Sequence, residues 1–157
     1  MGPTTVRVLL SVAVVLAFAG MADAAYLTVV HYADQPIVCS GIGDCELVNS
    51  SRYAEFAGVP VALLGLGAYA ALAALGGAAG VRGDVGLLAV AWGVALAGVL
   101  FSGYLTYIEL RVLEAICPYC VVSAALMTAI FAVLSAALWR THSRRAASVS
   151  YSVGFAE

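Results

Sequence analysis

The sequence contains little charge and no lysine. Charged residues make up 10% of the 157 residues, whereas hydrophobic residues make up 64%, and the mean hydropathy is +1.03. A soluble domain carries about 25% charged residues, so this composition excludes the soluble classes and indicates a membrane protein. The alternating pattern of a membrane β-barrel is also absent, as is any internal repeat. The remaining class is an all-α integral membrane protein.

Four apolar runs are each long enough to cross the hydrocarbon core of a bilayer as a helix. They cover residues 8–30, 59–79, 85–108 and 116–139. The pattern predicts a four-transmembrane-helix bundle in one membrane domain, residues 1–140, with an extracytoplasmic loop lid between helices one and two. The GVRGD stretch at 80–84 predicts a tight turn between helices two and three. Residues 141–157 are polar and aperiodic and predict a short, disordered cytoplasmic tail.

The first run has a second interpretation. It starts with a basic residue, Arg7, and contains an A-x-A pattern at 22–24, as a cleaved signal peptide does. The apolar run nevertheless continues to residue 30, which a removed signal does not require. We therefore expect the first run to be retained as a helix.

Arginine, which accumulates in cytoplasmic loops, sets the expected orientation. A cytoplasmic N-terminus places five arginines inside and two outside; the inner ones are Arg7, Arg82, Arg140, Arg144 and Arg145, and the outer ones are Arg52 and Arg111. This arrangement predicts a multi-pass protein of the inner or plasma membrane with both termini cytoplasmic. All four cysteines then lie on the extracytoplasmic side, where disulfides persist. The arginines of the tail are expected to contact anionic headgroups, not nucleic acid.

The CPYC stretch contains Cys117 and Cys120 on either side of Pro118 and Tyr119. Proline is best tolerated in the first turn of a helix, so a helix is expected to begin near Pro118. Cys117 would then lie near the N-cap and Cys120 one turn further on. Unpaired N–H groups and the helix dipole lower the pKa of a thiol at such a position, which increases its reactive thiolate fraction.

A second pair, Cys39 and Cys45, lies in the glycine-containing loop CSGIGDC. One mobile and one fixed pair form a relay in which a thiolate attacks a disulfide. Two alternatives remain, a four-cysteine zinc site and two structural disulfides. Haem attachment is excluded because it needs CxxCH and residue 121 is Val. We favour the redox relay and expect no metal.

Several other residues have both a functional and a structural interpretation. Asp23 is a charge within an apolar run and hence a functional candidate, or a partly wetted carboxylate near the membrane boundary. His31 and Glu109 either handle protons or are solvated at helix ends. Tyr69 and Trp92 either line a ligand pocket or pack helices together.

A further pattern concerns helix packing in the third run. Ala89, Gly93 and Ala97 recur at every fourth position. Small residues with this spacing allow two helices to approach closely. We therefore expect this face of the helix to contact a neighbouring helix of the bundle.

Two stretches together carry a family resemblance. CSGIGDCELVNSSRYAEFAGVPVALLGLGAY (39–69), followed by YLTYIELRVLEAICPYCVVS (104–123), resembles the vitamin K epoxide reductase family, in particular its bacterial quinone-linked members. The shared features are a loop cysteine pair, a serine six residues after its second cysteine (Ser51), GVPVALLG at the start of a helix, and a CxxC at the start of the last core helix. The resemblance covers about residues 25–125.

The resemblance implies a four-helix bundle that encloses a quinone, with a role for each matched residue. Cys120 would face the quinone and pass electrons to its ring. Cys117 would exchange with Cys45 through a transient interloop disulfide, and Cys39 would pair with Cys45 and meet the thiols of an external protein. Ser51 would donate a hydrogen bond to a quinone oxygen, where reduction builds up negative charge. Taken alone, Ser51 is also a plausible cap or turn residue beside a short helix over 51–56.

The implied function is that of a membrane thiol–quinone oxidoreductase supporting disulfide-bond formation. Electrons would pass from a DsbA-like thioredoxin-fold protein to ubiquinone or menaquinone. No thioredoxin-like domain is appended to the matched region, so we expect this partner to be a separate protein. The alternatives are reduction of a vitamin K quinone or epoxide and, from a different class, a structural membrane protein braced by disulfides.

Overall fold

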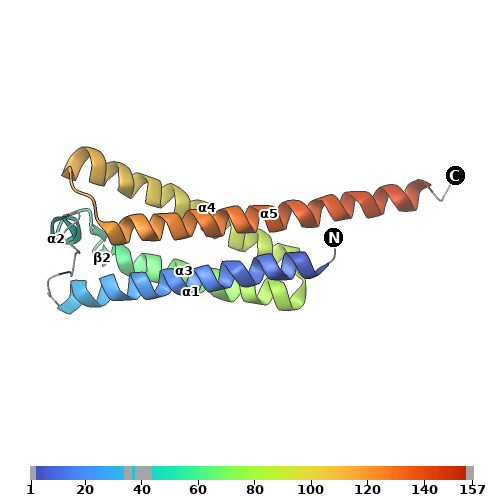
Figure 1. Ribbon diagram of the computed structural model, residues 1–157, viewed down its shortest axis with the longest axis horizontal. Helices are drawn as coiled ribbons and strands as arrows, with labels where there is room; N and C mark the ends of the chain where they lie inside the picture. Colours follow the sequence, from blue (N-terminus) through green and yellow to red (C-terminus); the bar gives the residue numbers. More distant parts are fainter. Residues whose placement is uncertain (1–2, 34–36, 38–43, 155–157) are drawn as a thin grey trace.

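A computed structural model describes residues 3–33, 37 and 44–154 and shows an all-α bundle of four long helices (Figure 1). The elements in chain order are α1 (Pro3–Ala33), α2 (Cys45–Asn49), β1 (Glu55–Phe56), β2 (Val59–Pro60), α3 (Val61–Arg82), α4 (Val85–Ile108), the π-helical turn η1 (Glu109–Leu113) and α5 (Pro118–Gly154). Within these residues, α1, α3, α4 with η1, and α5 are long and apolar enough to cross a membrane. The predicted four-helix membrane class is therefore confirmed.

The turn between α3 and α4 follows directly from its sequence. Gly83 adopts a left-handed conformation (φ 66°), and its N–H donates to the Ala79 carbonyl oxygen at 2.9 Å, which closes α3. Asp84 then caps α4, because its Oδ1 accepts the Gly86 N–H at 2.7 Å. The predicted tight turn at 80–84 is thus present, and α3 and α4 form an antiparallel hairpin.

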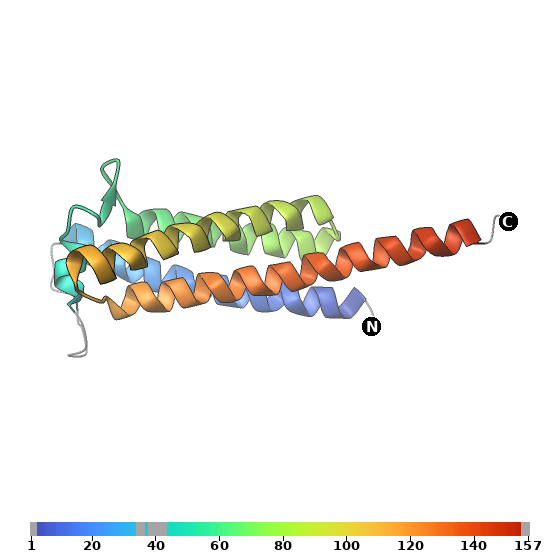
Figure 2. The same cartoon turned by 90° about the horizontal axis from the view of Figure 1, so that it is seen from above.

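The four long helices form a ring in which each helix packs against its two neighbours. α1 packs against α3 and α5, and α4 packs against the same two helices from the opposite side. The views in Figures 1 and 2 agree that both termini lie at one end of the bundle, while α2 and the β-hairpin lie at the other end. The described segments that carry cysteines, α2 and the start of α5, therefore lie at the same end of the molecule.

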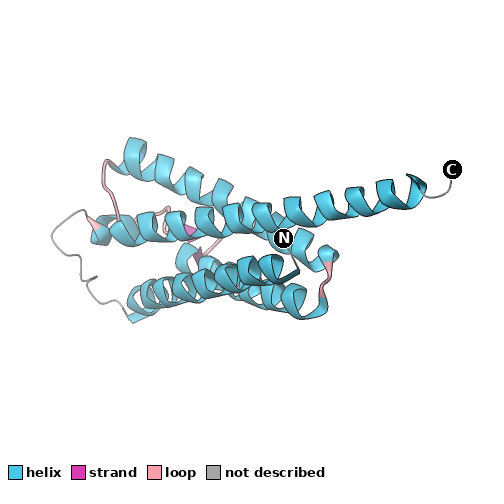
Figure 3. Ribbon diagram, turned by 45° about the vertical axis from the view of Figure 1, so that its right-hand side comes forward, coloured by secondary structure: helices cyan, strands magenta, loops and turns pink. Residues whose placement is uncertain are grey.

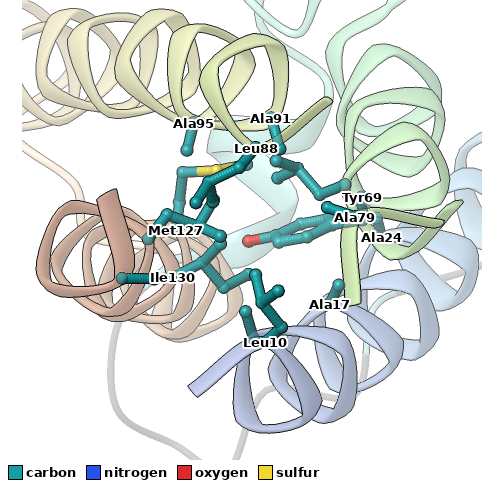
Figure 4. Close-up of a cluster of buried hydrophobic side chains, with 14 residues drawn as sticks. Leu10, Ala17, Ala24, Tyr69, Ala79, Leu88, Ala91, Ala95, Met127 and Ile130 are labelled. Carbon is teal, nitrogen blue, oxygen red and sulfur yellow. The ribbon is translucent and has the colours of Figure 1, made fainter. Parts of the chain in front are cut away.

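The core is built largely from small side chains. Ala17, Ala91 and Ala95 are completely buried, which allows α1 and α4 to approach their neighbours closely. Figure 4 shows the Tyr69 ring between these helices, with its hydroxyl pointing toward α5. A side chain at Gly20 would overlap the Tyr69 ring, so the glycine allows α1 to pack directly on the flat face of this tyrosine.

The small-residue stripe expected to mediate helix packing does not do so. Ala89, Gly93 and Ala97 are all exposed, and no neighbouring atom lies within 4 Å of where a Gly93 side chain would begin. The buried face of α4 instead contains Leu88 and the two alanines of the core. The prediction was wrong because spacing shows that residues share a face, but not which way that face points.

The segment between α2 and α3 forms a hairpin, not the short helix considered for residues 51–56. β1 pairs antiparallel with β2, and the turn between them contains Ala57 (φ 53°) and Gly58 (φ 79°). Two consecutive positive φ angles are typical of a type I′ hairpin turn. Pro60 follows as the N-cap residue of α3, in agreement with the expected start of a helix at the GVPVALLG stretch.

The last helix extends well beyond the other three. α5 continues to Gly154 and projects from the bundle in Figures 2 and 3. The polar composition of residues 141–157 predicts disorder, whereas the structure is helical as far as Gly154. Because no proline or glycine interrupts α5 between Pro118 and Gly154, it has no strong local stop signal.

Candidate redox site

A cavity of about 520 Å³ lies at the end of the bundle that carries α2 and the hairpin. All four long helices contribute to its lining, together with η1 and the segment from α2 to β1. The lining is largely apolar with a few polar groups, as in ordinary sites for small molecules. Tyr69, Ser123 and Met127 form its floor; the Tyr69 hydroxyl donates to the Ser123 carbonyl oxygen at 2.8 Å. This hydrogen bond links α3 to α5 across the bundle.

The CxxC pair lies where the proline predicts it to lie. α5 begins at Pro118, and the Cys117 carbonyl oxygen accepts the Val121 N–H at 3.1 Å, so Cys117 occupies the N-cap position. Cys120 lies one turn further along the helix. Both residues are free thiols that line the cavity, but Cys117 is 1% exposed and Cys120 is only partly buried. The two sulfurs therefore have different surroundings.

Cys45 is brought into the same region by α2. It is disulfide-bonded and shares a small buried cluster with Cys117, on which Cys120 also packs. The chain segments next to the two cysteines are joined directly, since the Asp44 N–H donates to the Ile116 carbonyl oxygen at 3.1 Å. Asp44 also caps α2 by accepting the Leu47 N–H at 3.0 Å. Cys39 lies outside the described residues.

Glu109 is a buried acid beside the CxxC pair. It is 5% exposed, and its Oε2 accepts the Cys117 N–H at 3.1 Å. The solvated interpretation of Glu109 is therefore wrong. η1 gives the reason: this π-helical turn closes with a bond from the Ala115 N–H to the Glu109 carbonyl oxygen at 3.1 Å and keeps Glu109 at the wall of the cavity. Such turns inside α-helices occur frequently at functional sites.

Neighbouring groups lower the pKa of the Cys117 thiol. A hydrogen bond from the Cys120 side chain, followed by N–H groups of the first turn of α5, lowers the pKa of Cys117 below its ordinary value of 9.0, although burial and the Glu109 charge act in the opposite direction. The thiolate of the pair is therefore expected on Cys117, with Cys120 as its hydrogen-bond donor.

Ser51 also lines the cavity, from the turn that follows α2. Its hydroxyl donates to the Val48 carbonyl oxygen at 2.8 Å, so it acts as a turn serine and does not cap a helix. The hydroxyl is partly exposed and can rotate toward another acceptor. Ser51 can therefore both stabilise the turn after α2 and offer its hydroxyl to a ligand in the cavity.

Of three further candidate residues, Trp92 and His31 lie away from the cavity, whereas Tyr69 lines it. The Trp92 indole donates to the Ser135 hydroxyl at 2.9 Å and does not line the cavity, so Trp92 packs helices together. His31 forms an ion pair with Glu55 at 3.5 Å, which joins the end of α1 to the hairpin. Tyr69 lines the cavity, as its ligand-pocket interpretation requires, and also packs in the core.

The arrangement is that of a buried CxxC beside an apolar cavity, approached by a second cysteine on a separate segment. The model of the vitamin K epoxide reductase family matches residues 11–135. The chain belongs to this family. Vitamin K epoxide reductase family members are membrane oxidoreductases that use quinones, and the cavity, the helices and the thiols described above have the properties that such an activity requires.

The sequence predicts the position of Asp23 in the site only in part. Asp23 lines the cavity from α1, and its Oδ2 atom is buried without a hydrogen-bond partner in the described structure. The sequence showed that the residue lies in an apolar run, which makes it a candidate. It could not show that one carboxylate oxygen is buried without a partner, or that the residue lines the same cavity as the thiols.

Proposed function

We propose that this chain is a thiol–quinone oxidoreductase that supports disulfide-bond formation. In this proposal a separate DsbA-like thioredoxin-fold protein delivers electrons to Cys39 and Cys45. The electrons then pass to Cys117 and Cys120, and from there to ubiquinone or a quinone of the menaquinone type. The proposed orientation places both termini in the cytoplasm and the cysteines outside, because more arginines flank the spans on the inner side.

One observation carries the proposal. The Asp44 N–H bonds to the Ile116 carbonyl oxygen at 3.1 Å, which holds the disulfide-bonded Cys45 in the same buried cluster as the free thiol of Cys117. Cys120, one turn away, lines the cavity. Two structural disulfides would require neither the free thiols of Cys117 and Cys120, nor a cavity beside them, nor Cys45 packed against Cys117.

The relay consists of two thiol–disulfide exchanges. A thiolate of the partner attacks the proposed Cys39–Cys45 disulfide, and the second partner thiol completes the exchange and leaves Cys39 and Cys45 reduced. Cys45 then attacks Cys117 of an oxidised CxxC, which forms the interloop disulfide and frees Cys120. Cys39 attacks Cys45 in turn and frees Cys117. Each exchange moves two electrons, and every S–S bond that breaks is replaced by another.

The cavity residues suit a quinone headgroup. The volume of about 520 Å³ lies in the range of small-molecule pockets, and its apolar walls contain a hydroxyl at Ser51 and an unpartnered carboxyl oxygen at Asp23. A bound quinone would supply a two-electron acceptor. Closure of the Cys117–Cys120 disulfide would break the Cys120 S–H bond and release two electrons and one proton, and the Ser51 hydroxyl would stabilise the negative charge on a neighbouring acceptor oxygen.

The proposal can be tested by anaerobic turnover. The purified protein is mixed with a reduced DsbA-like protein and a short-chain ubiquinone, and quinol formation is followed for the wild type and for Cys120→Ala. Thr128→Ala is a matched control, because this exposed residue lies on α5 away from the cavity and bonds only to its own helix, at the Ala124 carbonyl oxygen. We expect turnover in the wild type and the control and none in Cys120→Ala, with thiol exchange at Cys45 retained.

Two results would count against the proposal. Full turnover in Cys120→Ala would remove this thiol from the electron path. A folded wild-type protein that reduces no quinone, and whose disulfides resist mild reductants, would favour the structural role instead.

A further inference from the structure

Asp23 is the residue of the cavity whose chemistry is not used by the relay. It lies in the middle of the apolar sequence of α1 and lines the cavity together with Ala24 and Leu27. Among the described residues its Oδ2 is the one buried side-chain oxygen or nitrogen atom found without a hydrogen-bond partner. Buried polar atoms almost always have partners, because leaving one unpaired costs about 1–3 kcal/mol. An unpaired oxygen in a carboxyl group that lines a cavity therefore points to a missing ligand group.

No cation balances this carboxyl in the described structure. The ionisable groups that act on it electrostatically are phenols, Tyr69 on α3 and Tyr119 on α5. The other titratable groups of the cavity lining are Tyr53, Glu109, Cys117 and Cys120, and none of them is basic. An isolated carboxylate in apolar surroundings is strongly disfavoured and takes up a proton instead. The apolar lining of the cavity therefore favours the protonated form of Asp23, which has an O–H group to donate.

The position of Asp23 is set by close packing. Gly20, one turn earlier on α1, allows the helix to lie against the Tyr69 ring, and a side chain at Gly65 of α3 would begin 3.9 Å from Cβ of Ala24. α1 is thus held against α3 on both sides of Asp23. The carboxyl group is thus held at the wall of the cavity, and the side chain is partly exposed there, so its interpretation as a partly wetted carboxylate is compatible with this position.

We propose that Asp23 binds the electron acceptor in the cavity, donating a hydrogen bond and then a proton to one of its two carbonyl oxygens. This inference rests on the proposed function and adds a residue that supplies protons. Ser51 has a hydroxyl that is an inefficient acid, so it stabilises charge without delivering a net proton. Apart from Glu109 and the thiols, Asp23 is the strongest acid of the cavity lining, since the other titratable groups there are the weakly acidic phenols of Tyr53 and Tyr69.

The proton and electron balance closes over one turnover. Starting from the Cys117 thiolate and the Cys120 thiol, one S–H bond breaks, one S–S bond forms, and two electrons and one proton are released. The second proton of the quinol is the one that Cys117 lost when its thiolate formed. One of the new O–H bonds is made with the proton of Asp23, which becomes a carboxylate and accepts a hydrogen bond from the hydroxyl it has just formed. A proton released by the thiols then restores the carboxyl group.

Variants of Asp23 separate binding from proton delivery. Asp23→Asn keeps a hydrogen-bond donor but cannot release a proton, so kcat with a short-chain ubiquinone is expected to fall about 100-fold, the usual effect of removing a general acid, with KM little changed. Asp23→Leu removes the donor as well and is expected to raise KM in addition. Asp84→Asn is the matched control: it makes the same substitution in the cap of α4, away from the cavity, where asparagine also caps well.

A second measurement needs no variant and no turnover. Dicyclohexylcarbodiimide, an apolar reagent that modifies protonated carboxyl groups, is applied to the wild-type protein in detergent with and without the short-chain ubiquinone. Peptide mass spectrometry then reports the modification of Asp23. We expect Asp23 to be modified, and the quinone to protect it.

The outcomes distinguish the two proposals. If the wild type reduces no quinone, the proposed function fails, whatever the state of Asp23. If the wild type reduces quinone while Asp23→Asn matches Asp84→Asn in kcat, the assignment of Asp23 is wrong. Absence of modification at Asp23, or modification that the quinone does not reduce, would also overturn it, even if Asp23→Asn failed to fold.

Discussion

Replacement of Glu109 tests how the buried acid supports the CxxC pair. Its Oε2 accepts the Cys117 N–H at 3.1 Å, and the side chain is 5% exposed. Glu109→Leu would leave this N–H buried without its acceptor, which costs about 1–3 kcal/mol. The observed distance is longer than the 2.7–2.9 Å typical of charge-assisted bonds, so we expect about 1.5 kcal/mol of lost stability, a factor of about ten in the unfolding equilibrium.

Glu109→Gln should be more stable than Glu109→Leu, because the amide oxygen of glutamine can still accept the Cys117 N–H. Stability should therefore change little. The substitution removes a negative charge that raises the pKa of Cys117, so the pKa of this thiol should fall further below 9.0. The Cys117 thiolate would then be populated at lower pH than in the wild type.

The assay combines two measurements on purified protein. Unfolding in mixed detergent micelles gives the relative stability, and the pH dependence of Cys117 alkylation by a small thiol reagent gives its pKa. Glu114→Gln is the control, since Glu114 lies close by in sequence but is exposed. If Glu109→Leu were as stable as this control, the hydrogen bond would not support the N-cap as described.

Three further predictions concern the cysteines and Ser51. Cys120→Ala should enrich a Cys45–Cys117 disulfide, because the resolving thiol is absent, whereas Cys117→Ala should not form it; peptide mapping under non-reducing conditions distinguishes the two. In reduced protein, Cys120→Ala also removes the hydrogen bond that lowers the pKa of Cys117, so the rise of Cys117 alkylation with pH should move to higher pH, and an unchanged midpoint would contradict the pairing. Ser51→Ala removes a hydroxyl that lines the cavity, so quinone reduction should fall more than about tenfold. It also removes one part-buried hydrogen bond to the Val48 carbonyl oxygen, so stability should drop by about 1 kcal/mol or less. A loss of thermal stability as severe as the loss of activity would favour a purely structural role.

The sequence predicted those parts of the fold that depend on local chemistry. The four apolar runs became α1, α3, α4 and α5, the glycine and aspartate at 83–84 formed the expected turn, and Pro118 marked the start of α5. These features follow from hydrophobic length, from the left-handed conformation of glycine and from the fixed φ of proline. No information about distant parts of the chain is needed for any of them.

The remaining features depend on the direction in which a helix face points. The stripe at Ala89, Gly93 and Ala97 faces outward because the core contacts of α4 are made by its other small residues. Glu109 is buried because α4 ends in a π-helical turn, and Asp23 faces the cavity because Gly20 brings α1 onto Tyr69. The spacing of residues along one helix does not predict which of its faces is buried, because this depends on the side chains of the neighbouring helices.

The Tyr69–Ser123 hydrogen bond, at 2.8 Å, also divides the molecule along the membrane normal. Beyond this cross-link the described core consists of tightly packed aliphatic side chains such as Ile130 and Leu134, at most 1% exposed. The thiols, Asp23, Glu109 and most of the cavity lie on the other side of it. In the proposed reaction, protons released by thiol oxidation would be taken up by the quinone on the same side, so turnover would move no net charge across the bilayer. The enzyme should therefore work at the same rate whether or not the membrane is energised.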